Sequence, residues 1–369
     1  MRDDAALTTD NRPTRLAALR EALGKADLDG LLVTALPNIR YLTGFSGSSA
    51  LLLVTALDCV LFTDFRYEAQ VVDEVGRAAT VRIESTSLWN GVWPVIAGLP
   101  GVERIGFESA HLLHRDFARL LEQGSRWQWR PAADLVESLR AIKDAGEVAA
   151  ISRAVGMAER ALARTLPLLM PGMTETSAAG LLERHLREEG SEAYPFATIV
   201  ASGPRSALPH ARAGDRVFAT GDFILMDFGA VADGYCSDIT RTVVLGAANA
   251  DQRAFYEVVR EANARASGAI RVGMRGMAAD ALARDYIDAC GHGDAFGHSL
   301  GHGIGLEVHE APRLAKTVEA PLATGMVVTI EPGIYRPGWG GVRIEDDVLL
   351  TEDGAVVLTT FPRHLIEIA

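Results

Sequence analysis

The sequence predicts a protein of two domains, in which an N-terminal α/β domain precedes a C-terminal α+β domain. Its 369 residues exceed the length of one ordinary domain, for which about 150 residues is a usual figure. Over roughly the first 130 residues, short apolar runs alternate with helical patterns, which is typical of a sheet covered by helices. Long amphipathic helices and paired strands follow. We therefore place the domains at residues 1–132 and 133–369.

The N-terminal elements follow from these patterns in order. Apolar runs predict strands within 28–34, 49–63 and 103–109. Leucines spaced three to four apart predict helices within 15–28 and 111–124.

The C-terminal elements follow a different plan. Helical periodicity predicts two helices, which the breaker pair Pro171-Gly172 separates, and an Asp-Gly turn predicts a hairpin after them. The same series, two helices and then a pair of strands, follows again. This order, helix–helix–hairpin at about 145–246 and again at 251–350, hints at an internal duplication. The predicted helices are 147–169, 174–190, 253–266 and 276–291, and the predicted strands lie within 223–246, 326–332 and 341–350.

The composition excludes several classes of protein. Asp and Glu number 48 against 36 Lys and Arg, so the net charge is −12, which argues against a nucleic-acid binder and against docking on an anionic membrane. No apolar run reaches the about 20 residues of a membrane helix. Residues 1–12 are polar and lack the apolar stretch of a secretory signal. Three scattered cysteines form neither a disulfide framework nor a CxxC zinc site, so we expect a cytoplasmic protein.

Two acidic residues are placed to face each other in the first predicted hairpin. Asp227 ends an apolar strand, and Asp238 begins the next strand. If Ala230 faces Tyr235 across the loop, Asp227 faces Asp238 in the same register. Like charges at that distance repel unless a cation lies between them. A divalent metal is the expected cation, and a solvated acidic pair is the alternative.

The second pair of strands repeats this arrangement. Glu331 ends one strand and Glu345 lies in the other, with a loop rich in Gly and Pro between them. Arg343 lies two residues from Glu345 and therefore points to the same face. It can steady that carboxylate, pair with a substrate carboxylate, or form a plain structural ion pair.

Histidines supply further candidates. His298, His302 and His309 lie within a glycine-threaded stretch, where the absence of side chains lets the backbone approach something closely. His210 is a fourth candidate; taken alone, it is a loop histidine. The four carboxylates at 227, 238, 331 and 345 carry a charge of −4, which two divalent ions would neutralise. Two ions bridged by carboxylates and a water are a known hydrolytic device, and this ligand set suits Mn²⁺, Co²⁺, Fe²⁺ or Zn²⁺.

These motifs resemble those of the pita-bread metallopeptidases, which include methionine aminopeptidase, aminopeptidase P and prolidase. The matching stretches are MDFGAVADGYCSDITRT, FGHSLGHGIGLEVHE, TIEPGIY and GVRIED, within roughly 140–362. LPNIRYLTGFSGSSA and LFTDFRYEAQ resemble the creatinase/prolidase N-terminal domain, which methionine aminopeptidases generally lack. One departure is Ser299, where the family often has Gly.

The resemblance implies a C-terminal pita-bread fold, an N-terminal creatinase-like α/β domain and an Xaa-Pro aminopeptidase that acts on proline-containing peptides. It also implies two divalent ions per chain, Mn²⁺ first, with Co²⁺ and Zn²⁺ as alternatives, and a homodimer. The implied metal ligands are Asp227, Asp238, His302, Glu331 and Glu345.

The resemblance also implies roles for the remaining candidates. Glu331 handles a proton, and His210 or His309 stabilises the oxyanion. His298 and Arg343 are candidates for the proline side of the pocket. Alternatives are an Xaa-Pro dipeptidase (prolidase), a creatinase-like enzyme without metal, and a peptidase-like binding protein without catalysis. The last two would be favoured by broken ligand positions, and all five positions are filled.

Overall fold

The computed structural model describes residues 10–369, which form two compact units that meet between Arg140 and Ala141. Residues 1–9 lie outside the described part, and with them most of the segment for which we expect no secretory signal. The finer placement of the domain boundary at 132/133 stays a prediction. Within residues 10–369, no helix is both long and apolar enough to cross a bilayer.

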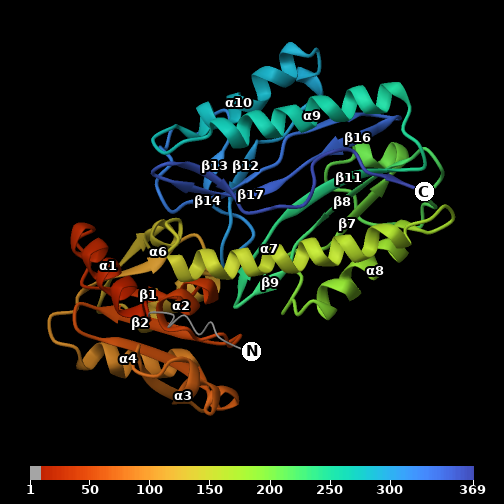
Figure 1. Ribbon diagram of the computed structural model, residues 1–369. Helices are drawn as coiled ribbons and strands as arrows, with labels where there is room; N and C mark the ends of the chain where they lie inside the picture. Colours follow the sequence, from red (N-terminus) through yellow and green to blue (C-terminus); the bar gives the residue numbers. More distant parts are fainter. Residues whose placement is uncertain (1–9) are drawn as a thin grey trace, which may run out of the picture. The chain divides into compact units, whose positions relative to one another are not determined.

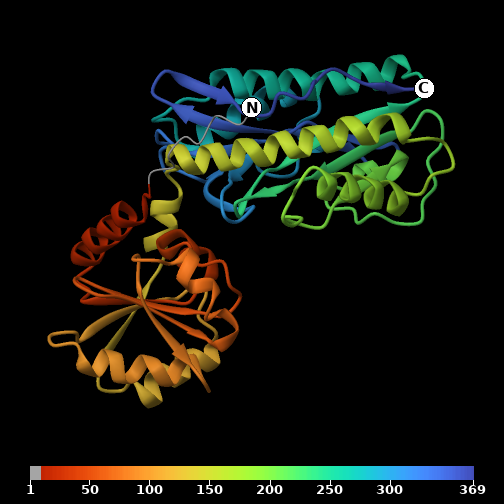
Figure 2. The same cartoon turned by 60° about the horizontal axis from the view of Figure 1, so that its bottom comes forward.

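The first unit is a mixed six-stranded sheet with helices on both faces (Figures 1 and 2). The strand order is β4-β3-β2-β1-β5-β6, and β1 pairs antiparallel with β2 but parallel with β5. The strands are β1 Gly30–Val33, β2 Leu51–Thr55, β3 Cys59–Asp64, β4 Thr80–Glu84, β5 Arg104–Glu108 and β6 Gln128–Ala132. The helices are α1 Arg12–Lys25, α2 Leu36–Thr43, α3 Gln70–Glu74, α4 Leu88–Gly98, α5 His114–Gln123 and α6 Leu135–Arg140.

The core of this unit explains why the apolar runs form strands. Leu32, Leu53 and Phe62 are wholly buried and pack with Val92 and Ile96 of α4 in one cluster. All four residues of β1 are buried, as expected for a central strand covered on both sides. The predicted strands and helices of the first unit are therefore present.

The second unit contains a four-stranded and a five-stranded sheet, of order β19-β11-β8-β7 and β13-β12-β14-β17-β18. Two further sheets have two strands each and are formed by β9 with β10 and by β15 with β16. The bounds are β7 Ile199–Ser202, β8 Phe223–Phe228, β9 Val231–Ala232, β10 Tyr235–Cys236, β11 Ile239–Leu245, β12 Gly301–Gly303, β13 Glu310–Leu314, β14 Val327–Ile330, β15 Gly333–Arg336, β16 Gly340–Arg343, β17 Asp346–Thr351, β18 Gly354–Val357 and β19 Glu367–Ile368.

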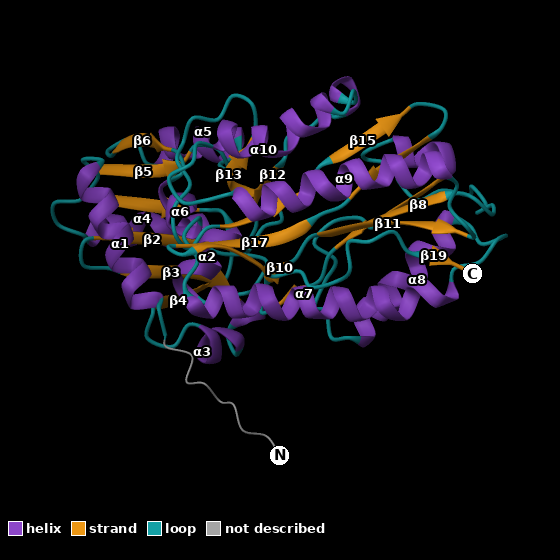
Figure 3. Ribbon diagram, turned by 45° about the horizontal axis from the view of Figure 1, so that its top comes forward, coloured by secondary structure: helices purple, strands orange, loops and turns teal. Residues whose placement is uncertain are grey.

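Four helices cover these strands: α7 Ala145–Thr165, α8 Glu175–Glu188, α9 Ala250–Ala269 and α10 Gly276–Ala289. The helices α7 and α9 run along opposite sides of the strands (Figures 1 and 3). Capping boxes begin both of them, formed by Asp144 with Glu147 and by Asn249 with Gln252. One core joins α7 and α8 to β8 and β11, and another joins α9 and α10 to β14 and β17. The second unit thus repeats helix pair and sheet, as the predicted duplication requires.

The glycines of the histidine-rich stretch have a structural reason. A Cβ on Gly301 would lie 2.0 Å from the Thr329 carbonyl oxygen, and one on Gly303 would lie 2.1 Å from that of Ala311. Both residues belong to β12, which lies between β13 and β14. The close approach that the sequence suggested is therefore between neighbouring strands, and it places His302 between two glycines in a buried strand.

No disulfide joins the three cysteines, and their reactivities are expected to differ widely. Burial raises the pKa of the Cys59 thiol to about 11. Cys236 is also buried, whereas Cys290 is exposed. Because the thiolate is the reactive form, we expect one fast-reacting thiol in the native protein and three after unfolding. Titration with a disulfide reagent checks this, and Cys290→Ser should abolish only the fast phase. More than one fast phase in the native wild-type protein would contradict it.

Candidate metal centre

The five residues predicted as metal ligands come from strands, or the ends of strands, in both sheets of the second unit. Asp227 lies in β8, and Asp238 lies directly before β11. His302 is the middle residue of β12, Glu331 follows β14, and Glu345 lies between β16 and β17. Four of them are buried, and Glu331 is half-buried.

The predicted register of the first hairpin is wrong by two residues. Ala232 faces Tyr235, so Thr240 rather than Asp238 faces Asp227. The reason is the turn, in which Asp233 and Gly234 both have positive φ, of 50° and 78°, and close a two-residue loop. A shift of two residues keeps every side chain on its original face, so both aspartates still point to one side of the sheet.

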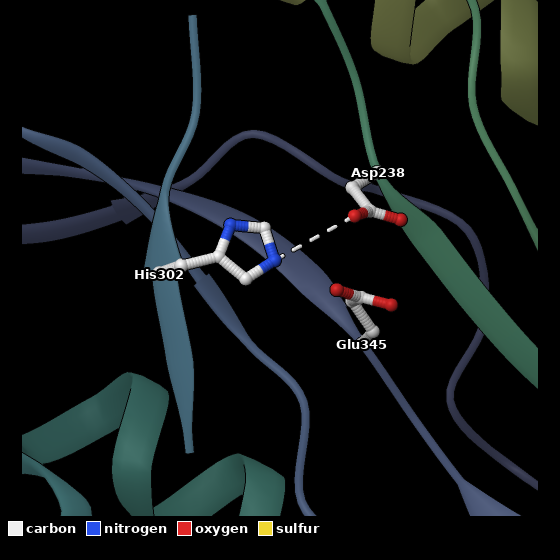
Figure 4. A group of neighbouring side chains, drawn as sticks. All are labelled: Asp238, His302 and Glu345. Atoms are coloured by element: carbon white, nitrogen blue, oxygen red, sulfur yellow. Dashed lines mark ion pairs between the residues drawn. The ribbon is translucent and has the colours of Figure 1, made fainter. Parts of the chain in front are cut away.

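Three of the predicted ligands converge on one point (Figure 4). Asp238, His302 and Glu345 each offer one ligand atom, and these atoms all lie within 4.8 Å of one another. His302 Nε2 lies 3.8 Å from Asp238 Oδ2 and 3.5 Å from Glu331 Oε1. The fourth predicted ligand therefore borders the same point.

The tautomer of His302 is fixed by its neighbours. Its Nδ1 lies 3.0 Å from the carbonyl oxygen of Gly303, which can only accept, so Nδ1 carries the proton. The lone pair on Nε2 then faces the carboxylates of Asp238 and Glu331. Burial lowers the pKa of His302 to about 4, so the ring is neutral at pH 7. A lone pair that faces two carboxylates is satisfied by a cation or a proton held between them, and a metal ligand held through its other nitrogen has this geometry.

The acidic side chains repel one another strongly. Burial, and then the charges of its acidic neighbours, raise the pKa of Asp238 well above its usual value. The pKa of Glu331 is raised well above its usual value, mainly by burial and by Glu345. Burial and the charge of Asp227 raise the pKa of Glu345 to about 8. Such a cluster is stable in its ionised form only if positive charge is bound within it.

Unsatisfied oxygens support the same conclusion. Asp227 Oδ1 and Asp238 Oδ1 are buried, and neither has a hydrogen-bond partner within the described residues. Buried carboxylate oxygens without a partner are costly, and metal coordination is one way to satisfy them. The residues present thus fit divalent cations.

Arg343 organises the edge of this cluster rather than projecting into solvent. Its guanidinium pairs with Asp227, and its Nε donates to the hydroxyl of Thr240 at 3.0 Å. Thr240 in turn donates to Glu345 Oε2 at 2.6 Å. Arg343 is 3% exposed, so its visible role is to fix two carboxylates, and its role at the proline side stays a prediction.

His298 lies at the end of a hydrogen-bonded chain that begins at Arg343. Arg343 donates to the hydroxyl of Tyr335 at 3.0 Å, and that oxygen lies 2.9 Å from His298 Nε2. Nδ1 of His298 lies 2.8 Å from the carbonyl oxygen of Ser299, so Nδ1 holds the proton and Nε2 accepts from Tyr335. Both ring nitrogens therefore have partners in the protein.

The two remaining histidines are exposed and border the same region. The ring centroid of His309 lies 4.4 Å from that of His302. His210 follows Pro209, whose carbonyl oxygen accepts from Arg343 at 3.2 Å. The fold thus brings His210 and His309 to the same side as the predicted ligands, and both residues are exposed.

Sequence reasoning missed several residues of this site. Besides Thr240 and Tyr335, Thr329 accepts from the His302 backbone N–H at 3.0 Å, and the wholly buried Asp347 accepts from the Asp238 backbone N–H at 3.1 Å. Arg313, an exposed residue, faces His302 across β12 and β13. Only Asp347 carried a usable signal, because it is a further acid two residues after Glu345, near the start of an apolar strand.

Comparisons with known proteins agree with this site. The chain matches the model of metallopeptidase family M24 over residues 149–352 and that of the creatinase/prolidase N-terminal domain over residues 15–142. A protein of Pyrococcus furiosus named Xaa-Pro dipeptidase is 36% identical over 356 residues, which cover 95% of this chain and 99% of that protein.

Two solved structures are similar over almost the whole chain. An Xaa-Pro dipeptidase from Bacillus anthracis has a TM-score of 0.94 at 39% identity and covers 97% of this chain and 100% of its own. An X-Pro aminopeptidase from Thermotoga maritima has a TM-score of 0.89 at 37% identity, and the match covers 96% of this chain and 99% of that one. The predicted pita-bread fold with a creatinase-like N-terminal domain is confirmed. This chain belongs to metallopeptidase family M24 and is a hydrolase whose family implies bound divalent metal.

Proposed function

We propose that this protein is an exopeptidase that hydrolyses the Xaa-Pro bond at the N-terminus of peptides, an Xaa-Pro aminopeptidase. The observation that carries the proposal is the convergence of Asp238, His302 and Glu345 on one point, with Glu331 beside them. The relatives named for Xaa-Pro hydrolysis, which match over nearly the full length, support the choice of substrate.

We propose that two divalent ions, Mn²⁺ first, are held by the five predicted ligands. Four carboxylates would balance the charge of two such ions, and one imidazole completes a set that suits Mn²⁺, Co²⁺ or Zn²⁺. When bound, two such ions lower the pKa of water and stabilise negative charge on the substrate carbonyl. The ligands are Asp227, Asp238, His302, Glu331 and Glu345.

The residues of the chain supply the remaining steps. Glu331 is half-buried beside His302, and in this proposal it accepts a proton and returns it. The nitrogen of an Xaa-Pro bond has no N–H and must be protonated before it departs, so a proton carrier at this position is required. His309 and His210 would donate hydrogen bonds to the carbonyl oxygen as charge develops there. The ring of His298 would border the proline.

A second candidate, an Xaa-Pro dipeptidase, is favoured by Arg313. In an Xaa-Pro dipeptide the proline carries the free C-terminal carboxylate, and recognition of that carboxylate calls for a cationic side chain. Arg343 is buried and paired, whereas Arg313 is exposed. Its charge lowers the pKa of both His302 and His309, after the larger effect of burial. Arg313 is also the register partner of His302 across β12 and β13, so in this second proposal its guanidinium pairs with a carboxylate that lies against these histidines.

Substrate length tests the two candidates directly. We expect hydrolysis of both Xaa-Pro and Xaa-Pro-Yaa-Zaa in the presence of Mn²⁺, with kcat/KM at least equal for the longer peptide if the site is open. If Arg313 binds the carboxylate of a dipeptide, Arg313→Gln should raise KM for Xaa-Pro by about 10- to 100-fold, as the loss of a charge-assisted contact predicts, and leave the tetrapeptide unchanged.

Replacement of the exposed Arg336 by Gln is the matched control. Absence of hydrolysis of both peptides with any of Mn²⁺, Co²⁺ and Zn²⁺ would contradict the proposed function. The homodimer and the cytoplasmic location stay predictions, which sedimentation and fractionation can test.

A further inference from the structure

We propose that Glu175 and Asp280 are positioning residues, each of which holds a histidine-bearing loop in place beside the acidic cluster. Glu175 fixes the loop of His210, and Asp280 fixes the loop of His298. The inference rests on the proposed function for the roles of His210 and His298. The positions of the two loops do not depend on those roles.

Glu175 is a buried carboxylate whose hydrogen bonds all reach one loop. Its side chain is 0% exposed. Oε1 accepts from both the backbone N–H and the hydroxyl of Ser202, each at 2.8 Å, and Oε2 accepts from the backbone N–H of Gly214 at 3.1 Å. Ser202 and Gly214 are the two ends of the segment that carries His210. One carboxylate therefore ties together the base of the loop.

Arg205 strengthens the same anchor from within the loop. Its Nε lies 3.0 Å from Glu175 Oε2, and its Nη2 donates to the carbonyl oxygen of Arg212 at 2.6 Å. Thr176 donates to the carbonyl oxygen of Gly214 through both its N–H and its hydroxyl. The segment 202–214 is thus folded around Glu175, and His210 remains exposed.

These bonds are not needed to begin helix α8. The N-cap of that helix is Thr174, whose side chain accepts from the backbone N–H of Ser177. The carboxylate of Glu175, the next residue, serves the loop instead. Burying an acid costs free energy unless its oxygens are satisfied, so a buried acid directed at one loop indicates that the position of the loop matters.

Asp280 holds the second loop in a related way. Its side chain is 1% exposed, and its Oδ1 accepts from the backbone N–H of Leu300 at 3.0 Å. The same carboxylate pairs with Arg284, which donates to the carbonyl oxygens of Phe296 and His298 at 2.8 Å and 2.7 Å. Three backbone groups of segment 296–300 are thus fixed by one acid and one arginine.

The two anchors occupy corresponding elements of the duplicated domain. Helix α8 is the second helix of the first half, and α10 is the second helix of the second half. Each presents a buried acid near its start, and each acid pairs with an arginine that contacts backbone carbonyls of the loop. Because the acid is a glutamate in α8 and an aspartate in α10, the two halves share the arrangement of the anchor and not a sequence motif.

The two substitutions are expected to have different kinetic effects. Glu175→Gln keeps the shape of the side chain but turns one acceptor into a donor facing N–H groups. If His210 stabilises the oxyanion, this change should lower kcat about 10- to 100-fold with little change in KM. Asp280→Asn loosens the loop of His298, on the proline side, and should raise KM by about the same factor with a smaller effect on kcat.

Amide hydrogen exchange supplies a readout that needs neither metal nor turnover. In metal-free protein we expect exchange to quicken within 202–214 for Glu175→Gln and within 296–300 for Asp280→Asn, and to stay unchanged elsewhere. The matched controls are Glu188→Gln on α8 and Asp285→Asn on α10, which make the same chemical changes at exposed positions. These controls should alter neither exchange nor kinetics.

The outcomes separate this inference from the proposed function. Faster exchange confined to the named loop supports positioning, and unchanged exchange in that loop overturns it. If Glu175→Gln or Asp280→Asn exchanges faster throughout the protein, amide exchange is measured on Arg205→Gln or Arg284→Gln instead. Faster exchange confined to the named loop then supports the inference, and any other result overturns it. Glu175→Gln should cause no further loss in a His210→Ala background. A His210→Ala protein with full turnover would contradict the catalytic role of His210 while leaving the exchange result in force.

Discussion

Replacing His302 by alanine is expected to lower kcat on an Xaa-Pro peptide by about 10³-fold, the scale lost when a group that stabilises transition-state charge is removed. His302 is the one nitrogen ligand in the proposed set, and its Nε2 faces Asp238 and Glu331. Without the imidazole, the four carboxylates must hold the cations alone and in altered positions. Kinetics at saturating Mn²⁺, with metal content measured on the same sample, check this prediction.

The control for this substitution is His364→Ala, which changes an exposed histidine of the same unit and should leave kcat unchanged. Circular dichroism should show that both variants keep the fold, because His302→Ala leaves the backbone hydrogen bond to Thr329 in place and removes only side-chain contacts at the site, such as those with the Gly303 carbonyl oxygen and the His309 ring. Substantial turnover by a His302→Ala protein shown to be free of metal would contradict the two-metal mechanism.

The predicted ligands stand out in the sequence because each lies in, or at one end of, an apolar strand or a glycine-rich stretch. Asp227 and Glu331 follow buried runs whose period is plain, and His302 lies in a stretch with an unusual density of glycine. Local patterns of this kind can be recognised in the sequence without knowledge of the fold. The helices α7 and α9 were equally visible, since their length and capping residues are local features.

The contacts around the predicted ligands could not be predicted in the same way. Arg343 reaches Asp227 across a separation of 116 residues, and Thr240 reaches Glu345 across 105. Such pairs depend on how the two sheets meet. The register error in the first hairpin arose because a two-residue turn replaced the expected four-residue loop. Short elements such as α3 and the exposed strand β4 carry too little periodicity to detect.

Between pH 6.5 and pH 8, the metal-free protein is expected to lose stability as pH rises. The folded state raises the pKa of Glu345 to about 8, and the pKa values of Asp238 and Glu331 are also raised well above their usual values, in each case chiefly by burial. In the unfolded chain these carboxyls are ionised throughout this range. The folded state therefore binds more protons, and its advantage is full below the unfolded pKa and is lost as pH approaches the folded pKa.

The chosen range isolates the carboxyls from the histidines. Burial lowers the pKa of His302 and of His298 to about 4, so these rings would favour higher pH only below their unfolded pKa of about 6.5. Above pH 6.5 they are neutral in the folded state and mostly neutral in the unfolded state, where the remaining charge is lost by about pH 7.5. Each carboxyl that stays protonated in the folded protein then contributes a loss of about 2 kcal/mol over 1.5 pH units. A loss of about 2 kcal/mol in the second unit would lower its Tm by about 4–8 °C.

Divalent cations should reverse this dependence, because they replace the protons that the acidic cluster otherwise needs. Calorimetry at pH 6.5 and pH 8, with chelator and with Mn²⁺, should show a larger gain in Tm from metal at pH 8. Asp238→Asn should weaken both the pH dependence and the gain, whereas Asp285→Asn, at an exposed position, should change neither. A metal-free protein whose Tm is flat or rising over this range would show that the cluster holds no excess of protons. The repulsion among the acids, and with it the physical reason for two cations, would then be absent.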